Sequence, residues 1–458
     1  MKSIKQEVND FLHRSMDSHV RVAVTGLSRA GKTAFITSLV NQLLHTSTHN
    51  QLPLLHATRD KRVIGAKREP QTNMMVPRFA YDEAMTQLHG TEPNWPEPTR
   101  DVSEIRLAIK YKPTKKTKKL LGGTSTLHLD IIDYPGEWLL DLPLLDMDFA
   151  EWSQSQFVAL SGKRLELAKP WLEALEKVDL SADIDEVMLQ SVAKTYTDYL
   201  HACKEQGLHW VQPGRFVLPG ELEGAPVLQF FPVRFDNEQK IARDSNLAML
   251  KARYQEYQNK VVKAFYKHHF STFDRQIVLV DCLQPLNAGY ESFMDMRNAL
   301  EQLMHSFRYG RSNIVKRLFA PRIDKILFAA TKADHITPDQ HTNLVSLLQQ
   351  MVHPAWQTAS FENIEMSCMS MASIQATQTG FIASGDQSIP ALQGIAMDGA
   401  PLTVYPGEVP KKLPAADYWH NKGFEFTAFK PMPSHQDEPL PHIRIDKALQ
   451  YLLGDKLK

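Results

Sequence analysis

Val22-Ala23-Val24-Thr25-Gly26-Leu27-Ser28-Arg29-Ala30-Gly31-Lys32-Thr33 is the stretch that decides the fold of this 458-residue chain. It begins as an apolar run and ends in the pattern G-x-x-x-x-G-K-T. The residues that follow, 34–40, repeat apolar side chains at the spacing of a helix. A strand, a glycine loop and a helix in this order are what a phosphate-binding loop requires, so the sequence predicts such a loop here.

The residue types in this loop suit phosphate chemistry. Gly26 lets the chain leave the strand in a tight curve, and Gly31 lets the backbone approach an anion closely. Successive N–H groups and the positive end of the following helix then face the phosphate oxygens. Lys32 supplies a charge to the β- and γ-phosphates of a nucleotide, and Thr33 supplies a hydroxyl to Mg²⁺. We therefore expect the nucleotide to contact the following group of residues: Gly26, Ser28, Arg29, Ala30, Gly31, Lys32, Thr33 and Ala34.

Two further apolar strands end in an aspartate that could hold Mg²⁺ through a water. Asp133 is followed by Tyr134-Pro135-Gly136, which gives the pattern D-x-x-G, whereas no glycine follows Asp281. A nucleotide switch needs that glycine, because its N–H bonds the γ-phosphate and its missing side chain permits movement when the phosphate leaves. We therefore assign the metal to Asp133 and the γ-phosphate to Gly136. Asp281 stays open as the alternative metal ligand or as a structural acid.

Thr331-Lys332-Ala333-Asp334 directly follows another apolar strand and has the pattern [N/T]-K-x-D that recognises guanine. The Asp334 carboxylate can accept from guanine N1–H and N2–H₂ together, whereas adenine offers no such pair of donors. The stem of Lys332 would pack along the base. Further on, the backbone N–H groups of Ala372 and Ser373 could reach guanine O6, although the same residues also suit the start of a helix. The expected ligands are GTP or GDP and Mg²⁺.

Residues 95–100 lie where a first switch loop is expected, shortly before the next strand. Thr99 is the candidate for contact with Mg²⁺ and the γ-phosphate, and Trp95 and Arg100 are candidates for covering the nucleotide. The alternative is an ordinary proline-rich loop.

Composition limits the possible partners and compartment. Lys and Arg number 52 together, as do Asp and Glu, so the chain has no overall charge that would recruit nucleic acid or an anionic membrane. Its three cysteines are widely spaced and suggest neither disulfides nor a metal site. The N-terminus does not resemble a signal peptide, and no apolar run has membrane-spanning length. We expect a cytoplasmic protein with no nucleic-acid partner and no direct insertion into a membrane.

The strand and helix signals along the chain define its organisation. Residues 103–111 and 124–133 predict an antiparallel hairpin, and 46–98 predict a mostly irregular surface connection with one short helix from Tyr81 to Leu88. Apolar side chains from 137 to 268 recur at helical intervals. Strands resume at 276–283 and 325–330, separated by a helix over 290–307, with a weaker strand at 363–366. The Pro- and Gly-rich tail predicts only short β-like pieces, such as 424–429, before a closing helix from Asp446.

These signals predict an α/β fold, a P-loop NTPase (Ras-like) domain with a mostly parallel sheet and one antiparallel edge strand. We expect residues 1–136 and 269–380 to form its two parts. Residues 137–268 would form a large helical insertion, and residues 381–458 a C-terminal extension.

With these motifs in place, the chain resembles the translation-factor-like class of P-loop GTPases and, more narrowly, the YcjX-like family of bacterial GTP-binding proteins. The segments that carry the resemblance are G-L-S-R-A-G-K-T, D-Y-P-G-E-W-L-L-D-L-P, V-D-C-L-Q-P-L-N-A-G, T-K-A-D and L-P-H-I-R-I-D-K-A-L-Q-Y-L-L-G-D-K-L. The resemblance implies nucleotide binding through residues 28–34 and Asp334, and a stress-related role. It also implies a membrane-protein partner of the YcjF type, and through it a peripheral position at the membrane.

One residue departs from the wider class. Glu137 follows the D-x-x-G pattern at a position that often carries Gln or an apolar residue. A carboxylate near the γ-phosphate adds like charge, so it could orient water only if Mg²⁺, Lys32 or Arg29 offsets the repulsion. Slow intrinsic hydrolysis is the expected consequence.

The sequence therefore predicts a GTP-binding switch that hydrolyses GTP slowly with Mg²⁺ and signals to a protein partner. The candidate catalytic residues are Lys32, Thr99, Gly136 and Glu137, and the candidate metal ligands are Thr33, Thr99 and Asp133. Two alternatives stay open. An ATP-dependent small-molecule kinase would also need the phosphate-binding loop. A nucleotide-binding scaffold without turnover would be consistent with Glu137.

Overall fold

The structure is a computed structural model that describes residues 17–27, 29–90, 92–98, 100–114, 123–235, 242–306, 323–361, 364–384, 387–421, 423–435 and 438–458. The chain divides into two compact units. The first comprises the described parts of Met1–Tyr134, Phe273–Leu283 and Arg322–Lys458, and the second those of Pro135–Thr272 and Gln284–Pro321.

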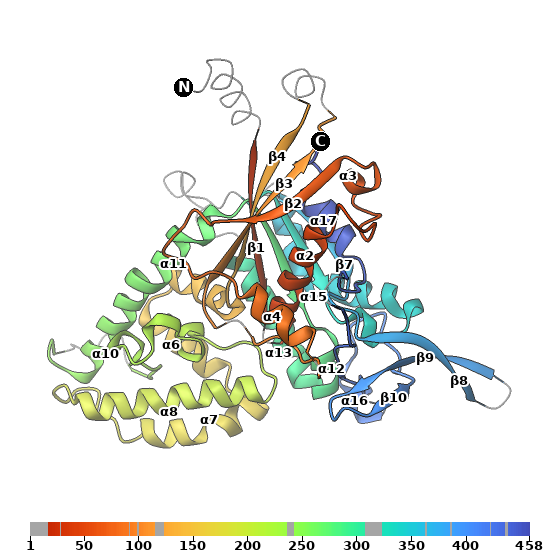
Figure 1. Cartoon of the computed structure of the whole chain (residues 1–458). Coiled ribbons are helices and arrows are strands. Elements are labelled where there is room, and N and C mark those ends of the chain that lie inside the picture. The colour runs from red at the N-terminus through yellow and green to blue at the C-terminus, as the bar shows by residue number, and fades with distance from the viewer. Residues whose placement is uncertain are drawn as a thin grey trace, which may run out of the picture. The chain divides into compact units, whose positions relative to one another are not determined.

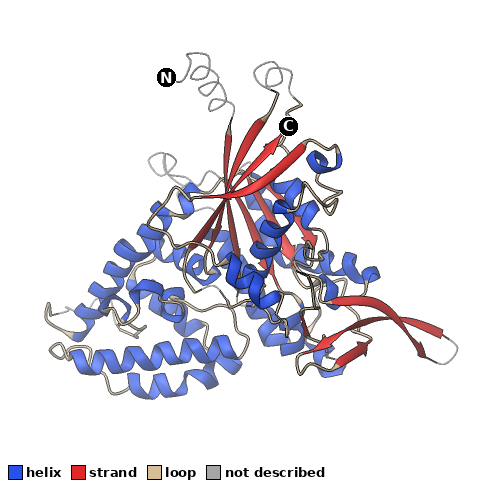
Figure 2. Cartoon of the chain, viewed as in Figure 1, coloured by secondary structure: helices blue, strands red, loops and turns tan. Residues whose placement is uncertain are grey.

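A seven-stranded sheet organises the first unit (Figures 1 and 2). Its order is β2-β3-β4-β1-β5-β6-β7. The strands are β1 (Ser18–Gly26), β2 (Val63–Glu69), β3 (Ser103–Tyr111), β4 (Ser125–Asp133), β5 (Arg275–Val280), β6 (Lys325–Ala330) and β7 (Glu365–Ser370). Strands β4, β1, β5, β6 and β7 run parallel, whereas β3 is antiparallel to both β2 and β4. The α/β class with a mostly parallel, Ras-like sheet is therefore confirmed.

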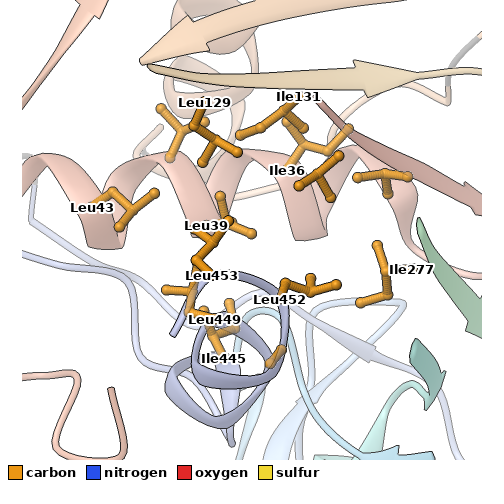
Figure 3. Packing of buried hydrophobic residues seen from close by; sticks show 14 of the residues in the cluster. Ile36, Leu39, Leu43, Leu129, Ile131, Ile277, Ile445, Leu449, Leu452 and Leu453 are labelled. Carbon is orange, nitrogen blue, oxygen red and sulfur yellow. The ribbon is translucent and has the colours of Figure 1, made fainter. Parts of the chain in front are cut away.

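Two helices far apart in the sequence share one face of this sheet. They are α2 (Lys32–Leu44), which follows the glycine loop, and α17 (Ile445–Leu453), which closes the chain. Apolar residues of α17 recur every three to four positions, so they form one stripe that faces the core. Figure 3 shows the side chains that meet there: Ile36, Leu39, Leu43, Leu129, Ile131, Ile277, Ile445, Leu449, Leu452 and Leu453. Burial of each such side chain contributes about 1.5–3 kcal/mol, so the C-terminal helix is part of the core of this unit.

The sheet contains one strand that the sequence did not predict. Residues 46–98 were expected to be mostly irregular, but they include α3 (His56–Arg59) and strand β2 as well as the expected helix α4 (Tyr81–Leu88). Strand β2 pairs with β3, so the antiparallel strand β3 is second from the edge. Charged residues such as Lys67, Arg68 and Glu69 are typical of a sheet edge protected against further pairing, and they obscure the strand pattern.

A second, four-stranded sheet also belongs to the first unit. It consists of β8 (Thr377–Ser384), β9 (Gln387–Ala396), β10 (Pro401–Val404) and β11 (Phe429–Lys430), with β9 antiparallel to the other three. The prediction of only short β-like pieces in the tail is wrong here, because β8 and β9 form a long hairpin (Figure 1). Residues 424–428 form no strand. Among its described residues, this unit also contains the helices η6 (Ala333–His335), η7 (Pro338–Gln340), α15 (His341–Phe361) and α16 (Ala416–Asn421).

The described residues of the second unit form helices and loops without a strand (Figure 2). The helices are η1 (Gly136–Asp146), α6 (Phe149–Val158), α7 (Gly162–Leu175), α8 (Glu186–Glu205), α9 (Gly214–Val217), η2 (Gly220–Leu222), η3 (Pro226–Leu228), α10 (Asn246–Glu256), η4 (Tyr257–Val262), α11 (Lys263–His268), η5 (Phe270–Thr272) and α13 (Tyr290–Ser306); α12 (Leu283–Ala288) begins at the last residue of the first unit. Buried aromatic rings fill its core, among them Trp152, Trp171, Tyr196, Phe230 and Tyr254.

Candidate functional site

The strand register brings the predicted motifs to one edge of the seven-stranded sheet. Gly26, the last residue of β1, lies beside Leu279 of β5, and Asp133, the last residue of β4, lies beside Val24 of β1. On the other side of β1, Ala330 of β6 lies beside Val280 of β5 and Ser370 of β7. The glycine loop, Asp133, Asp281 and the Thr331–Asp334 loop therefore all leave the sheet at the carboxyl ends of its parallel strands. Ligands of open α/β sheets bind at this edge, where the strand order reverses around β1.

The glycine loop has the backbone of an anion-binding site. Arg29 and Gly31 both have positive φ, 63° and 82°, a conformation that turns neighbouring N–H groups toward a common centre. The Lys32 ammonium donates to the carbonyl of Gly26 at 3.0 Å, so it reaches back across its own loop. The first N–H groups of helix α2 have no acceptor within the helix. These features fit a bound phosphate group. Ser28 lies outside the described residues.

The expected first switch segment lies against this loop. The Thr33 hydroxyl donates to the carbonyl of Glu97 at 2.9 Å, and the Glu97 N–H donates to the side-chain oxygen of Gln87 at 3.2 Å. The indole N–H of Trp95 donates to the carbonyl of Phe429 at 2.8 Å. The structure thus brings residues 95–97 next to the predicted magnesium ligand Thr33. Arg100 is exposed, and Thr99 lies outside the described residues.

The two candidate magnesium acids differ in their surroundings. Asp281 is engaged by Lys332, whose ammonium lies 2.6 Å from its Oδ2, and it also accepts from the Leu283 N–H at 3.1 Å. Asp133 is buried at the end of β4, directly before Tyr134. The hydroxyl of Tyr134 accepts from the Gln276 amide at 2.5 Å, and burial raises the pKa of this phenol well above its usual value. The side chain that directly follows Asp133 is thus buried and held by Gln276.

Asp334 is held in place by the chain that follows β7. Its Oδ2 accepts from the Ala376 N–H at 2.8 Å, and its backbone carbonyl accepts from the Thr377 hydroxyl at 2.5 Å. A carboxylate has about four lone-pair sites, so this arrangement leaves acceptor capacity for the two donors of guanine. Lys332 has a φ of 58°, which turns the chain sharply before Asp334. Burial lowers the pKa of the neighbouring His335, which favours the neutral imidazole beside the carboxylate.

One of the two donors expected to face guanine O6 is engaged elsewhere in the chain. The N–H of Ala372 donates to the carbonyl of Ile443 at 3.1 Å, and the Ile443 N–H bonds back to Ala372 at 2.9 Å. Ser370 is bonded to Arg444. Of the two residues singled out from the sequence, Ser373 therefore remains the candidate donor.

Gly136 and Glu137 belong to the second unit and are described within it. Glu137 is buried in the first turn of η1, and its carboxylate forms an ion pair with Lys204 of α8, with Nζ 2.8 Å from Oε1. The next residue, Trp138, donates to the carbonyl of Leu218 at 2.9 Å, and the guanidinium of Arg215 lies 3.2 Å from its ring centre. The chain that continues from Asp133 is therefore firmly anchored among these helices. Within this unit, the ammonium of Lys204 offsets the charge of Glu137.

Asp141, further along η1, is a fully buried acid in the second unit. It accepts from the N–H of Gly214 at 2.7 Å and from the hydroxyl of Tyr257 at 2.6 Å. Burial nevertheless outweighs these bonds and raises the pKa of Asp141 from 3.8 to about 6. Because the folded chain holds this proton longer than the unfolded chain, the contribution of Asp141 to stability is fully present below pH 4 and is lost as the pH rises through 6.

Asp141→Asn should therefore change the pH dependence of folding. A shift of about two pKa units corresponds to ~3 kcal/mol, so the variant should gain up to about this much relative to wild type between pH 4 and pH 7. Urea unfolding of both proteins at a series of pH values measures the difference, with the exposed Asp183→Asn as the control. A difference in unfolding free energy that does not change with pH would contradict the raised pKa.

Several contacts at the site could not be inferred from the sequence. Ala376 and Lys204 each contact a candidate residue, and Gln87 contacts Glu97 of the expected switch segment. None of the three belongs to a motif, and each lies 10 or more residues from its partner. Among the described parts of the chain, no helix combines the length and hydrophobicity that crossing a membrane requires.

Comparison with known proteins places the chain in a family. The model of the YcjX-like family, DUF463, matches residues 20–457. Ras-like GTPase YcjX of Escherichia coli (strain K12) is 55% identical to this chain over 465 aligned residues, which cover 100% of both proteins. Ras-like GTPase YcjX of Shewanella oneidensis is 44% identical over 479 residues, which cover 100% of this chain and 99% of that relative. With a match along nearly its whole length, the chain belongs to the YcjX-like family.

Proposed function

We propose that this chain is a guanine-nucleotide switch that hydrolyses GTP slowly with Mg²⁺ and signals to a protein partner. The observation that carries the proposal is the common sheet edge at which the glycine loop, Asp133 and the Asp334 loop end. A nucleotide spanning this edge would have its phosphates at the glycine loop and its base near Asp334. Both curated relatives are named as Ras-like GTPases, which supports the same function.

The proposed preference for guanine rests on the Asp334 carboxylate. It is an acceptor-only group, and guanine presents two adjacent donors to it, whereas adenine does not. This feature favours a GTPase over an ATP-dependent kinase, because a kinase would need the glycine loop but not a carboxylate that recognises guanine.

Thr33 and Asp133 are the proposed protein ligands of Mg²⁺, together with Thr99. Hydroxyl and carboxylate oxygens suit this hard cation, which would neutralise charge on the β- and γ-phosphates when bound. Lys32 would add its own charge to the same phosphates after leaving the Gly26 carbonyl. The fixed position of Tyr134 supports Asp133 as the acid of choice, and the ion pair with Lys332 supports a structural role for Asp281.

Slow turnover follows from the state of Glu137. Its carboxylate is engaged by the Lys204 ammonium at 2.8 Å, and this ion pair would have to rearrange before Glu137 could orient a water. We further propose that Gly136, Glu137 and Trp138 pass the state of the nucleotide to the helical unit, where a partner would respond. The stress-related role, and a partner of the YcjF type that brings the chain to the membrane, rest on family resemblance alone.

Asp133→Asn should abolish Mg²⁺-dependent GTP hydrolysis, whereas Asp281→Asn should leave most of it. The reason is that the amide at position 133 would lack the negative charge that holds the metal and its water. Phosphate release under single-turnover conditions, with and without Mg²⁺, measures this. If Asp281→Asn is the inactive variant, the choice of acid is wrong. If the wild-type protein binds GTP but releases no phosphate above the Lys32→Ala background, even with partner present, a scaffold without turnover is the better description.

A further inference from the structure

The second sheet begins at the proposed guanine site. Ala376 and Thr377, which lead into β8, bond the side chain and the backbone of Asp334 at 2.8 and 2.5 Å. Thr377 in turn pairs with Gly394 of β9. A movement of β8 and β9 near Thr377 and Gly394 would therefore act directly on Asp334, the residue that is proposed to recognise guanine.

The same sheet also holds the expected switch segment. Trp95 donates its indole N–H to the carbonyl of Phe429 in β11, and its ring packs against the apolar cluster of Ala376, Leu392 and Phe429. Two residues later, the Glu97 carbonyl accepts from the hydroxyl of Thr33. Residues 95–97 thus lie between the glycine loop and the second sheet, with a bond to each.

Phe429 connects these two contacts. It is buried with 1% of its surface exposed, and its ring meets the ring of His335, next to Asp334, edge to face at 5.3 Å between centres. The ring also fills the space over Gly394, where an added Cβ would lie only 2.7 Å from Phe429 Cδ1. A single residue therefore touches the Asp334 loop through its ring and the switch segment through its carbonyl.

We propose that the second sheet is a clamp on the nucleotide site, with Trp95 and Phe429 as its positioning residues. The inference rests on the proposed function. The clamp holds residues 95–97 beside the phosphate-binding loop and holds Asp334 beside the guanine base. A bound guanine nucleotide therefore leaves only when the second sheet moves away from these two segments. The clamp thus sets the rate of nucleotide release, and a partner that moves the β8–β9 hairpin would change this rate. No recognised motif contains Phe429, and the sequence alone gives it no role.

The test is the dissociation rate of fluorescent GDP, chased with excess unlabelled GDP, in the full-length chain. Trp95→Phe keeps an aromatic ring but removes the indole N–H, and Phe429→Leu keeps the backbone carbonyl and apolar character but removes the ring. Each should raise the dissociation rate at least tenfold. Phe381→Leu is the matched control, because Phe381 lies in β8 of the same sheet but is 65% exposed. It should stay within twofold of wild type.

A double variant and thermal unfolding separate a clamp from a general loss of structure. If Trp95 and Phe429 act through one clamp, the double variant should release GDP about as fast as the faster single variant, because the second change removes nothing further. Trp95→Phe should release GDP faster than wild type while its melting temperature stays unchanged. Wild-type dissociation rates in both single variants would overturn the clamp alone. Failure of wild-type protein to bind fluorescent GDP would overturn the proposed function and the clamp with it.

Discussion

Lys32→Ala is expected to remove tight nucleotide binding. The ammonium lies within the glycine loop, 3.0 Å from the Gly26 carbonyl, and can turn from there to bound phosphates. Charge-assisted hydrogen bonds contribute ~1.5–3 kcal/mol each, so losing two of them costs ~3–6 kcal/mol, or roughly a hundredfold to ten-thousandfold in affinity. Isothermal titration with GDP and with GTP measures the loss.

The control for this variant is Lys412→Ala, which removes an exposed lysine of the same unit. It should bind nucleotide like wild type. Unchanged GTP affinity in Lys32→Ala would show that the glycine loop does not hold the phosphates, and the assignment of residues 26–34 would then fail.

Asp334→Asn is expected to exchange one nucleotide preference for another. The Asn oxygen should keep the hydrogen bond from the Ala376 N–H, which is 2.8 Å long in wild type. The opposite orientation would place the Asn NH₂ group, a donor, against the Ala376 N–H, which is also a donor. The NH₂ group then takes the other carboxylate position and faces the guanine donors. Losing one charged hydrogen bond and adding one clash costs ~3–5 kcal/mol, a hundredfold or more in affinity for GTP.

Xanthine carries a carbonyl at C2 where guanine has its amino group, so it can accept from the new NH₂ group. The variant should therefore gain affinity for XTP as it loses GTP. Asp339→Asn, at an exposed position shortly after Asp334, is the matched control and should keep the wild-type preference.

The sequence was sufficient to predict those elements whose local residue pattern is also the pattern of a functional motif or a buried strand. The spacing and run length of apolar residues predicted several elements correctly: the glycine loop between β1 and α2, the hairpin of β3 and β4, and the buried strands β5 and β6. Parallel strands bring their carboxyl ends to one edge, so the convergence of Asp133 and Asp334 on the edge beside the glycine loop was also foreseeable.

The sequence was insufficient where structure depends on pairing with distant segments. Strand β2 carries charges suited to an edge, and hairpin β8–β9 contains Gly380, Pro390 and Gly394, residues that usually interrupt strands. Both form strands because a neighbouring strand completes their hydrogen bonds. The contact of Trp95 with Phe429 spans 334 positions of the chain, so no local pattern could predict it.

The same limit applies to the charge on Glu137. The sequence shows a carboxylate after D-x-x-G but cannot show that Lys204, from helix α8, is paired with it. Packing within the helical unit decides that pairing, as it also decides the burial that raises the pKa of Asp141 to about 6.

The proposed switch depends on binding of guanine nucleotide through the glycine loop and Asp334. Competition of unlabelled GTP, ATP and XTP against a fluorescent nucleoside diphosphate, GDP for wild type and XDP for Asp334→Asn, tests this binding. GTP should displace the probe from wild type far more effectively than ATP does, and XTP should become the strongest competitor in the variant. Equal competition by ATP and GTP in wild type, together with an unchanged order in the variant, would contradict it.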